Sequence, residues 1–305
     1  MNNEDLGSLI KNAEQISEDY RNNIASDKRV VKDEYQAKAY AASRMPATYQ
    51  AVLDSLRYVF KNSDMTVKSL LDVGAGTGAV AFACSDLLTV KEITLIEREE
   101  CMISIGKKLF EYAGDSLSEA EWIKGTFEDI STDCVYDLVT ASYVMNELND
   151  KEMEKAVLKM WEITSKILLI VEPGTPKGYK NILTIRDMLL KKGAYISAPC
   201  THADDCPMEK DDWCHFYNRV ERNKLHKQLK GGEAPFEDEK YSFIAFSREE
   251  RQLSLYRILR HPKINKGHII LTVCSKQGIK EITVSKREKE RYRDAKKLKA
   301  GDAFY

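Results

Sequence analysis

Four cysteines lie in sequence surroundings that are typical of metal ligands. Three fall within a polar segment punctuated by Pro, Asp and Trp, and the fourth ends a later apolar run; they are Cys200, Cys206, Cys214 and Cys274. In a reduced protein, thiolates that such loops bring together usually bind a metal and seldom pair as disulfides. Four thiolates suit either zinc or an iron-sulfur cluster, and His202 or His215 could replace one cysteine at zinc. The residue types alone leave both metal centres open.

A glycine-rich segment forms the second candidate site. The run Leu71-Asp-Val-Gly-Ala-Gly-Thr-Gly-Ala79 follows a predicted strand and opens a predicted helix, and Glu97 ends the next predicted strand. Glycines let the backbone turn sharply and approach a ligand, and an acidic residue at the end of the second strand can accept hydrogen bonds from ribose hydroxyls. The spacing Gly74-x-Gly76-x-x-Ala79 also satisfies a permissive dinucleotide pattern, so NAD is an alternative cofactor.

The same segment resembles the first motif of class I S-adenosylmethionine methyltransferases, because an acidic residue precedes the first glycine and a third glycine follows the second. Phe127-Glu-Asp129 at the adenine side and Tyr136-Asp-Leu-Val-Thr-Ala141 as the fourth strand extend the resemblance. It implies that the glycines line the methionine moiety, that the acid of the second strand binds ribose and that the later acid contacts adenine. The cofactor-binding residues are then Asp72, Gly74, Gly76, Gly78, Glu97 and Asp129. S-adenosylmethionine is therefore favoured over NAD.

The residues after the fourth predicted strand are the candidates for orienting a methyl acceptor. Methyltransferases that act on exocyclic base amines commonly carry Asp or Asn, Pro-Pro and an aromatic residue here, whereas this chain has Ser142-Tyr-Val-Met-Asn-Glu-Leu148. Tyr143, Asn146 and Glu147 can orient an acceptor. The competing interpretation is a polar start to the next helix. Pro199-Cys200 imitates the nucleophile of cytosine C5 enzymes but lies among other thiols after the fifth predicted strand, so we reject it.

An alternation of strands and helices must position these residues. Short β-rich runs separated by amphipathic helices across 69–171 predict a doubly wound parallel sheet, the Rossmann-like α/β core of a class I methyltransferase. The apolar stripe Val52, Leu56 and Val59 after Pro46 predicts a helical lead-in. We therefore divide the chain into a helical N-terminal region at 1–62, a cofactor-binding core at 63–194, a cysteine-rich metal-binding insertion at 195–240, closing strands of the core at 241–284 and a basic C-terminal tail at 285–305.

The charge balance restricts how the chain can meet a polyanion. Lys and Arg total 47 and Asp and Glu total 48, a formal net charge of −1. Binding to RNA therefore requires a local basic surface. We predict one from the arginines between the last predicted strands and the cations of the tail: Arg248, Arg251, Arg257, Arg260, Lys286, Arg287, Lys289, Arg291, Arg293, Lys296, Lys297 and Lys299. A solvated helix face is the competing interpretation, because Glu288, Glu290 and Asp294 interrupt the tail.

The N-terminus and the apolar runs bear on location. The chain starts Met1-Asn-Asn-Glu-Asp-Leu6, without the cationic start and apolar core of a secretory signal or the Arg-rich pattern of an organelle presequence. No apolar run in the sequence approaches membrane-spanning length. We expect a soluble, cytoplasmic protein that acts as a monomer away from membranes.

The complete pattern resembles one family, the methyltransferase-like assembly proteins of the small ribosomal subunit in bacteria and mitochondria. The matching segments are Arg44-Met-Pro-Ala-Thr-Tyr49, Asp72-Val-Gly-Ala-Gly-Thr-Gly78, Glu172-Pro-Gly-Thr-Pro176 with Gly178, Pro199-Cys200, Cys206-Pro207, Trp213-Cys-His-Phe216, Tyr241-Ser-Phe243 and Lys299-Ala-Gly-Asp302. The resemblance implies a [4Fe-4S] cluster on the four cysteines and association with the small ribosomal subunit, including S-adenosylmethionine-dependent methylation of its rRNA. The alternatives are a non-catalytic iron-sulfur assembly or translation factor, which the missing Pro-Pro motif favours, and a small-molecule methyltransferase.

Overall fold

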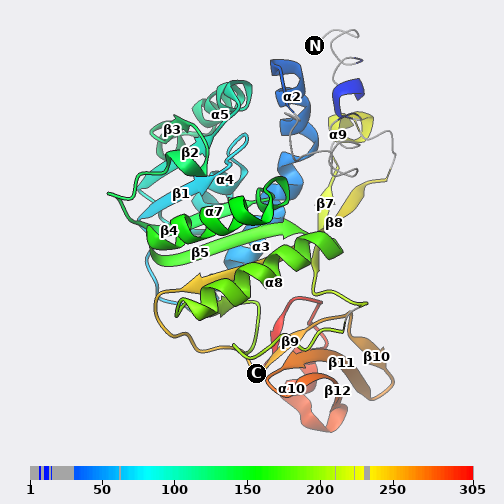
Figure 1. Ribbon diagram of the computed structural model, residues 1–305. Coiled ribbons are helices and arrows are strands. Elements are labelled where there is room, and N and C mark those ends of the chain that lie inside the picture. The colour runs from blue at the N-terminus through cyan, green and yellow to red at the C-terminus, as the bar shows by residue number, and fades with distance from the viewer. Residues whose placement is uncertain are drawn as a thin grey trace.

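The computed structural model describes residues 7, 10–13, 15, 31–61, 63–209, 211–222, 224–229 and 234–304. Its larger part is a mixed sheet with helices on both faces (Figure 1). The strands follow the order β3-β2-β1-β4-β5-β8-β6, and β7 pairs with β8. Their bounds are β1 (Ser69–Val73), β2 (Glu92–Glu97), β3 (Glu121–Lys124), β4 (Tyr136–Ser142), β5 (Thr164–Pro173), β6 (Tyr195–Ala198), β7 (Phe216–Glu221) and β8 (Phe236–Ser247).

The strand directions establish the fold class. β1 to β5 are parallel, whereas β8 runs antiparallel to its neighbours β5, β6 and β7. Val73 of β1 is level with Ile96 of β2 and Ala141 of β4, so the carboxyl ends of these three strands lie together at one edge. Ligands of open parallel sheets bind at such an edge. The predicted doubly wound α/β core of the class I methyltransferase type is confirmed.

Alternate side chains of the sheet build two apolar cores. In β5, Ile167, Leu169 and Val171 belong to one core, and Leu168 and Ile170 belong to the other. The first core includes side chains of α3 (Met45–Phe60) and α4 (Ala79–Leu87), and the second includes side chains of α7 (Asp150–Glu162) and α8 (Pro176–Lys191). Because both faces of β5 are buried at 167–171, this part of its sequence, Ile167-Leu-Leu-Ile-Val171, is an uninterrupted apolar run and does not alternate.

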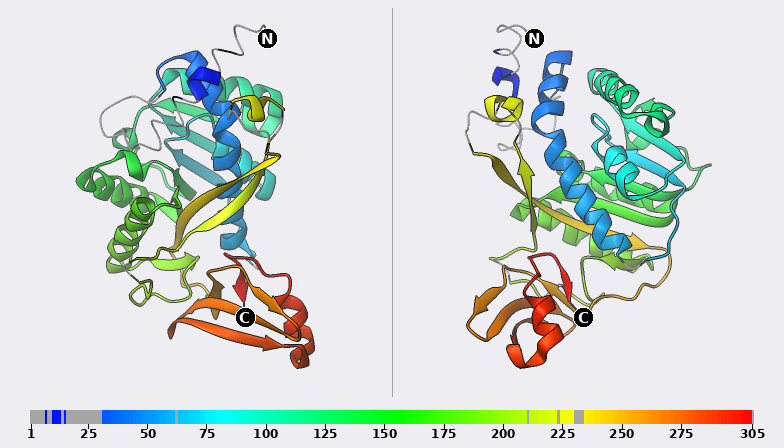
Figure 2. Two further views of the ribbon diagram at one scale, coloured as in Figure 1. Left: turned by 90° about the vertical axis from the view of Figure 1, so that its right-hand side faces the viewer. Right: turned by 180° about the vertical axis from the view of Figure 1, so that it is seen from behind.

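The predicted helix after Pro46 is confirmed as α3, which carries this proline in its first turn. Its stripe of Val52, Leu56 and Val59 is buried in the first core, so the helix is a layer of the fold. Figure 2 shows the strand pair β7 and β8 passing beside α3. The other helices of the core are α2 (Glu34–Ser43), α5 (Glu100–Ala113), α6 (Asp115–Ser118) and α9 (Lys224–Leu229). Most of residues 1–30, predicted as part of the helical lead-in, lie outside the described residues.

A second, smaller sheet contains the C-terminal strands in the order β10-β11-β9-β13, with β12 paired to β11. These strands are β9 (Tyr256–Ile258), β10 (Lys263–Asn265), β11 (His268–Ser275), β12 (Gly278–Ser285) and β13 (Ala303–Phe304). Ile269, Leu271 and Val273 of β11 are fully buried in the core of this sheet. The prediction that 241–284 supplies two closing strands to the main sheet is therefore wrong for β11, and only β8 pairs there. An apolar run indicates a buried strand but does not specify its partner.

The predicted insertion and tail are also built into the two sheets. β6 and β7, which lie within 195–240, both pair with β8, so this segment is not a separate insertion. In the tail, η3 (Lys286–Glu288) leads into α10 (Lys289–Ala295). Ala295 and Phe304 belong to the apolar core of the smaller sheet. Among the helices that the structure describes, none combines the length and apolar character that crossing a membrane requires.

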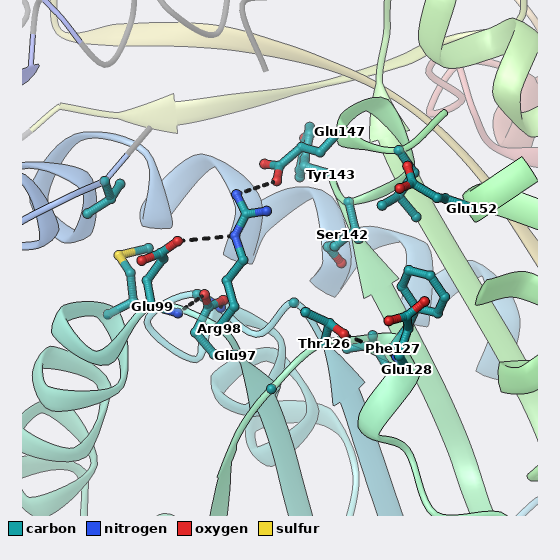
Figure 3. A pocket seen from close by; sticks show the side chains of 18 of the residues that line it. Glu97, Arg98, Glu99, Thr126, Phe127, Glu128, Ser142, Tyr143, Glu147 and Glu152 are labelled. Carbon is teal, nitrogen blue, oxygen red and sulfur yellow. Dashed lines mark hydrogen bonds and ion pairs between the residues drawn. The ribbon is translucent and has the colours of Figure 1, made fainter. Parts of the chain in front are cut away.

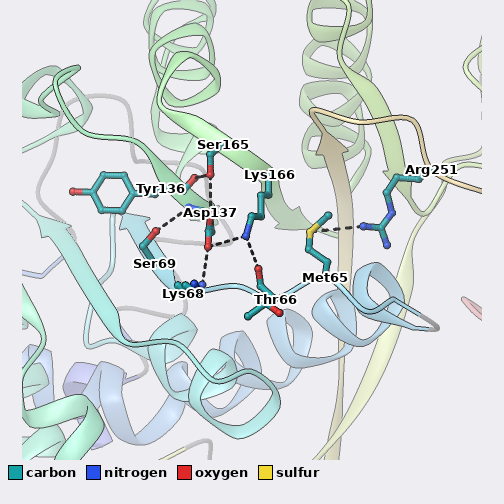
Figure 4. A network of polar contacts seen from close by, with 9 residues as sticks. All are labelled: Met65, Thr66, Lys68, Ser69, Tyr136, Asp137, Ser165, Lys166 and Arg251. Atoms are coloured by element: carbon teal, nitrogen blue, oxygen red, sulfur yellow. Dashed lines mark hydrogen bonds and ion pairs between the residues drawn. The ribbon is translucent and has the colours of Figure 1, made fainter.

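A polar network ties together the amino ends of the central strands, at the edge opposite the glycine loop (Figure 4). The Asp137 carboxylate accepts hydrogen bonds from the Lys68 backbone N–H at 2.8 Å and the Ser165 hydroxyl at 3.0 Å, and it pairs with the Lys166 ammonium at 3.1 Å. Burial alone would raise the pKa of Asp137, but these hydrogen bonds and the Lys166 charge lower it below its ordinary value. The ionised carboxylate therefore stabilises this edge.

Candidate functional site

A cavity of about 300 Å³ opens at the carboxyl ends of β1, β2 and β4. The loops that follow β1, β2, β3 and β4 line it, and α2 contributes Tyr40. Figure 3 shows side chains from the ends of β2 and β4 and from the loops after β2, β3 and β4 around a shared space. This is the edge at which the sequence predicts the cofactor.

The glycine loop forms the floor of the cavity. Gly74 and Gly76 line it, whereas Gly78 does not. Gly78 has a φ of +91°, and a Cβ there would lie 2.6 Å from the Phe110 ring, so this glycine serves the packing of the loop on α5. A Cβ on Gly76 would face Met102 and Tyr40 at 3.5 and 3.7 Å, and both of these residues line the cavity. The missing side chain at Gly76 therefore leaves room on the cavity side.

The two acidic residues of the predicted cofactor site have different surroundings. Glu97 lines the cavity, and its carboxylate accepts hydrogen bonds from the backbone N–H groups of Gly76 at 2.8 Å and Glu99 at 2.9 Å. Asp72 is fully buried beneath the loop and accepts a hydrogen bond of 2.7 Å from the Thr140 hydroxyl. Burial raises the pKa of Asp72 to about 7, and it also raises the pKa of Glu97. Of the two carboxylates, that of Glu97 can touch a ligand in the cavity and that of Asp72 cannot.

The loop after β3 lines the cavity with neighbours of the predicted residue. Asp129 accepts hydrogen bonds from the backbone N–H of Thr126 at 2.8 Å and from its hydroxyl at 3.3 Å, which caps η1 (Phe127–Asp129). Its carboxylate thereby shapes the loop, and the residues that line the cavity are Thr126, Phe127 and Glu128. The sequence analysis chose Asp129 as the residue that contacts adenine. The one sequence signal that Asp129 instead caps η1 was the capping pattern Thr126-x-x-Asp129.

Two of the three candidate catalytic residues reach the cavity. Tyr143 and Glu147 line it, and Tyr143 has a left-handed backbone φ of +62°, which is uncommon for a residue with a side chain. The Tyr143 hydroxyl donates to the Glu239 carboxylate at 3.3 Å. Asn146 does not line the cavity, because its amide oxygen accepts a hydrogen bond of 3.1 Å from Asn181 on α8. Sequence spacing placed these three residues in one segment but gave no direction for their side chains.

Arg98 is a site residue that the sequence analysis missed. Its guanidinium pairs with Glu99 at 3.2 Å and with Glu147 at 3.3 Å, so it joins the loops after β2 and β4 across the cavity (Figure 3). Burial raises the pKa of Glu147 to about 7, although the Arg98 charge acts in the opposite direction. The only sequence signal for Arg98 was its position directly after Glu97.

The four candidate metal ligands line one smaller cavity of about 40 Å³, between α8 and the smaller sheet, and all four are free thiols; they are Cys200, Cys206, Cys214 and Cys274. The Tyr179 hydroxyl lies 3.2 Å from the Cys206 sulfur, and His202 Nε2 lies 4.0 Å from the Cys274 sulfur. His215 does not line this cavity, and its Nδ1 lies 3.0 Å from the Trp213 carbonyl oxygen. Within the described ranges, no group of three His, Cys, Asp or Glu side chains has the arrangement of a metal-ion site.

The arginines that were predicted to face RNA bond instead to the protein. Arg248 donates to the Thr164 carbonyl at 2.7 Å, and Arg251 donates to the Val59 carbonyl at 3.3 Å. Arg257 is buried and donates to two carbonyls, and Arg260 binds the Asp212 carboxylate at 2.6 Å. Because Arg257 is buried, the prediction that it contributes to a basic RNA surface is wrong, whereas the contribution of Arg248, Arg251 and Arg260 stays a prediction. Exposed cations of the tail remain, among them Lys296, Lys297 and Lys299.

Residues 34–305, which make up most of the chain, match the family described as "Mitochondrial small ribosomal subunit Rsm22". The chain belongs to this family. A relative of this Rsm22-family chain is the human protein "Ribosome assembly protein METTL17, mitochondrial", which is 24% identical over 285 residues. The similarity covers 86% of this chain and 61% of the human protein, so the chain spans about three fifths of the length of that relative.

Two solved methyltransferase structures are similar to the Rsm22-family chain at low sequence identity. Magnesium protoporphyrin IX methyltransferase (ChlM) from Synechocystis PCC 6803, with bound SAM, is 11% identical with a TM-score of 0.45, over 76% of this chain and 91% of that one. A SAM-dependent methyltransferase from Aquifex aeolicus is 13% identical with a TM-score of 0.45, over 70% of this chain and 98% of that one. The fold assignment itself rests on the strand order and directions.

Proposed function

We propose that this protein binds S-adenosylmethionine and acts on the small ribosomal subunit, in its assembly or in the methylation of its rRNA. The observation that carries the proposal is a glycine loop and a strand-ending glutamate that share one cavity, in a methyltransferase fold whose family is named for the mitochondrial small ribosomal subunit. The similarity to a ribosome assembly protein supports the same process. The ribosomal role rests on the family, and the cofactor rests on the cavity.

The residues of the cavity fit S-adenosylmethionine. Gly74 and Gly76 let the backbone approach the methionine part, and Glu97 offers a carboxylate to the ribose hydroxyls. Phe127 lines the side where the adenine would lie and offers a ring for it to stack on. When bound, the cofactor supplies an activated methyl group. Asp72 and Asp129 support the residues that line the cavity. Asp72 lies beneath the glycine loop, and Asp129 caps η1 in the loop after β3.

Whether the methyl group is transferred depends on the loop after β4. Tyr143 and Glu147 lie at the cavity and are the residues that we assign to an acceptor. Their present partners, Glu239 and Arg98, and the turning of Asn146 toward α8 favour an assembly factor that keeps the cofactor cavity. Mass spectrometry of small-subunit rRNA from cells with and without the gene separates the two functions. A methyl group that is lost with the gene and restored only by a cofactor-binding protein supports the enzyme, and unchanged rRNA with impaired subunit assembly supports the factor.

We also propose that the four cysteines hold a [4Fe-4S] cluster, with zinc as the alternative metal. The donor set supports a thiolate-bound centre, because four thiols from two segments of the chain line one cavity. Such a centre would tie the smaller sheet to the core through Cys274 and would contribute free energy of folding. Anaerobic purification followed by iron, sulfide and zinc analysis identifies the metal. Absence of all three from wild type, together with unchanged stability when the cysteines are replaced by Ser, would exclude both centres.

The proposed partner is the small ribosomal subunit with its rRNA, and the exposed lysines after α10 are the proposed contacts. Cosedimentation of the wild-type protein with small subunits over a salt series tests this partner, because phosphate contacts weaken steeply as salt rises. Failure to cosediment at low salt at every stage of subunit maturation, together with methylation of a metabolite, would support the small-molecule alternative. The cytoplasmic location and the monomeric state stay predictions, which cell fractionation and light scattering measure.

A further inference from the structure

The charged side chains around the glycine-loop cavity are mostly acidic. Arg98 is the one cation among the described residues that line it, whereas five carboxylates do so; they belong to Glu97, Glu99, Glu128, Glu147 and Glu152. Figure 3 shows these side chains and Arg98 around one space. A cleft whose walls carry one sign of charge focuses the electric field inside it. The charge of a ligand should therefore influence its affinity for this cavity.

Three of the five carboxylates already have partners within the protein. Glu99 and Glu147 pair with the Arg98 guanidinium at 3.2 and 3.3 Å. Glu97 accepts hydrogen bonds from two backbone N–H groups, and burial raises its pKa. The negative charge of these three groups is therefore compensated or reduced in part. Selection of a ligand by its charge falls mainly to the other two carboxylates.

Glu128 and Glu152 line the cavity from two different elements. Glu128 lies on η1 and Glu152 in the first turn of α7, and both residues are exposed. The Glu152 carboxylate accepts a hydrogen bond of 2.9 Å from the Asn149 backbone N–H. The Lys159 ammonium donates to the backbone carbonyl of Glu128, and Lys159 does not line the cavity. Within the described part of the chain, neither carboxylate takes part in an ion pair.

S-adenosylmethionine and its demethylated product differ in charge. The methylated cofactor carries a sulfonium, an ammonium and a carboxylate group and is positive overall, whereas the sulfur of S-adenosylhomocysteine is neutral and its two charges balance. A positive ligand gains Coulomb energy beside carboxylates, and a neutral one does not. We propose that Glu128 and Glu152 make the cavity select the methylated cofactor over its demethylated product by charge. This selection rests on the binding of S-adenosylmethionine proposed above and specifies which form of the cofactor the protein retains.

Calorimetric titration of the full-length protein with three related ligands measures the selection. They are S-adenosylmethionine, S-adenosylhomocysteine and sinefungin, in which a carbon that carries an ammonium group replaces the methylated sulfur and keeps a positive charge. At low salt, wild type should bind both positive ligands at least about tenfold more tightly than S-adenosylhomocysteine. This ratio should shrink as salt rises, because salt screens the interactions of exposed charges.

A double variant, Glu128→Gln with Glu152→Gln, removes the two charges and keeps the shape of the side chains. Glutamine can still accept the hydrogen bond from Asn149, so the cap of α7 is retained. The affinity for each positive ligand should fall by about fivefold, whereas that for S-adenosylhomocysteine should not change. The matched control is Glu121→Gln with Glu154→Gln, since these exposed residues lie on β3 and α7 and do not line the cavity. The control should keep the wild-type ratio.

Each further outcome separates the selection from the binding of the cofactor itself. Equal affinities of wild type for S-adenosylmethionine and S-adenosylhomocysteine, or a wild-type ratio in the variant with both cavity carboxylates replaced, would overturn selection by charge while the cofactor stands. Sinefungin that binds no more tightly than S-adenosylhomocysteine would assign the preference to the methyl group and would likewise overturn it. A wild-type protein that binds none of the three ligands would overturn the proposed cofactor, and the selection with it.

Discussion

Replacement of Glu172 by Gln should stabilise the protein relative to wild type as the pH rises from about 5 to about 7. Glu172 lies near the end of β5 and is fully buried. Its carboxyl group accepts hydrogen bonds from the Met145 backbone N–H at 3.0 Å and from the Asn181 amide at 3.2 Å. Burial nevertheless raises the pKa of Glu172 from 4.5 to about 8. The folded protein therefore keeps this proton at neutral pH, and the unfolded chain releases it.

The magnitude follows from the number of bound protons. Between the two pKa values the native state binds one proton more than the unfolded state, so the free energy of unfolding falls as pH rises. A shifted group changes this free energy by about 1.4 kcal/mol for each pH unit, which gives about 3 kcal/mol between pH 5 and pH 7. The structure can relax around the ionised carboxylate and lower its cost, so about 3 kcal/mol is the upper limit of this change in the free energy of unfolding. The glutamine side chain does not titrate, so the variant lacks this loss.

Denaturant unfolding of wild type and Glu172→Gln at several pH values measures the difference. Glu154→Gln on the exposed face of α7 is the control, because solvent surrounds this carboxylate. The Glu154 variant should differ from wild type by the same amount at each pH, whereas the Glu172 variant should gain stability relative to wild type with rising pH. A constant difference for Glu172→Gln, or one that shrinks as the pH rises, would refute the reasoning that Glu172 is buried in its protonated form.

Three further predictions concern packing, charge and docking. Gly78→Ala should destabilise the fold by more than the roughly 1 to 2 kcal/mol of left-handed backbone strain alone, because the added Cβ would lie 2.6 Å from the Phe110 ring. Gly193→Ala is the control, since Gly193 has a φ of +80° and a Cβ there would meet nothing within 4 Å. Denaturant unfolding of the control variant measures the backbone strain alone. Asp137→Asn should destabilise the protein at neutral pH and progressively less as pH falls through the lowered pKa of Asp137, and an equal effect at every pH would contradict this. Charge reversal of the three exposed lysines after α10 should weaken cosedimentation with small subunits and reduce its salt slope by roughly one unit for each lysine–phosphate ion pair that the reversal removes, whereas reversal of three exposed lysines on α5 and α7 should not. The test lysines are Lys296, Lys297 and Lys299, and the control lysines are Lys107, Lys151 and Lys155.

The sequence predicted the features that short-range physics determines. The order strand, glycine loop, helix and acidic strand end is local, and the structure brings Gly74, Gly76 and Glu97 to one cavity. The alternation of apolar runs and amphipathic helices likewise predicted the main sheet. Apolar residues must recur with the period of a strand or of a helix if they are to form one buried face of that element. Three of the four cysteines, Cys200, Cys206 and Cys214, were found for a different reason. Thiols in polar loops have little to contribute to packing, so their presence there indicated a shared ligand.

The features that the sequence did not predict depend on contacts between distant segments. β11 has the composition of a closing strand, but its partners are β9, β10 and β12 in the smaller sheet. Arg257 looked like an RNA contact, yet carbonyls of Pro199 and Gly301 take up its donors in the folded chain. Asn146 and Glu147 are adjacent and point to different elements. Neither strand pairing nor side-chain direction is encoded within a few residues of these positions.

Calorimetric titration with S-adenosylmethionine tests the central claim most directly, in wild type and two alanine variants. Gly76→Ala places a methyl group toward the cavity residues Met102 and Tyr40 at 3.5 and 3.7 Å, and Gly193→Ala adds the same group at a left-handed position with nothing within 4 Å. Both changes should cost the fold roughly 1 to 2 kcal/mol. Wild type and Gly193→Ala should bind S-adenosylmethionine equally, and Gly76→Ala should bind at least about tenfold more weakly, a loss of about 1.4 kcal/mol. Tighter binding of NAD, no binding by wild type, or equal affinities of the two variants would contradict the account.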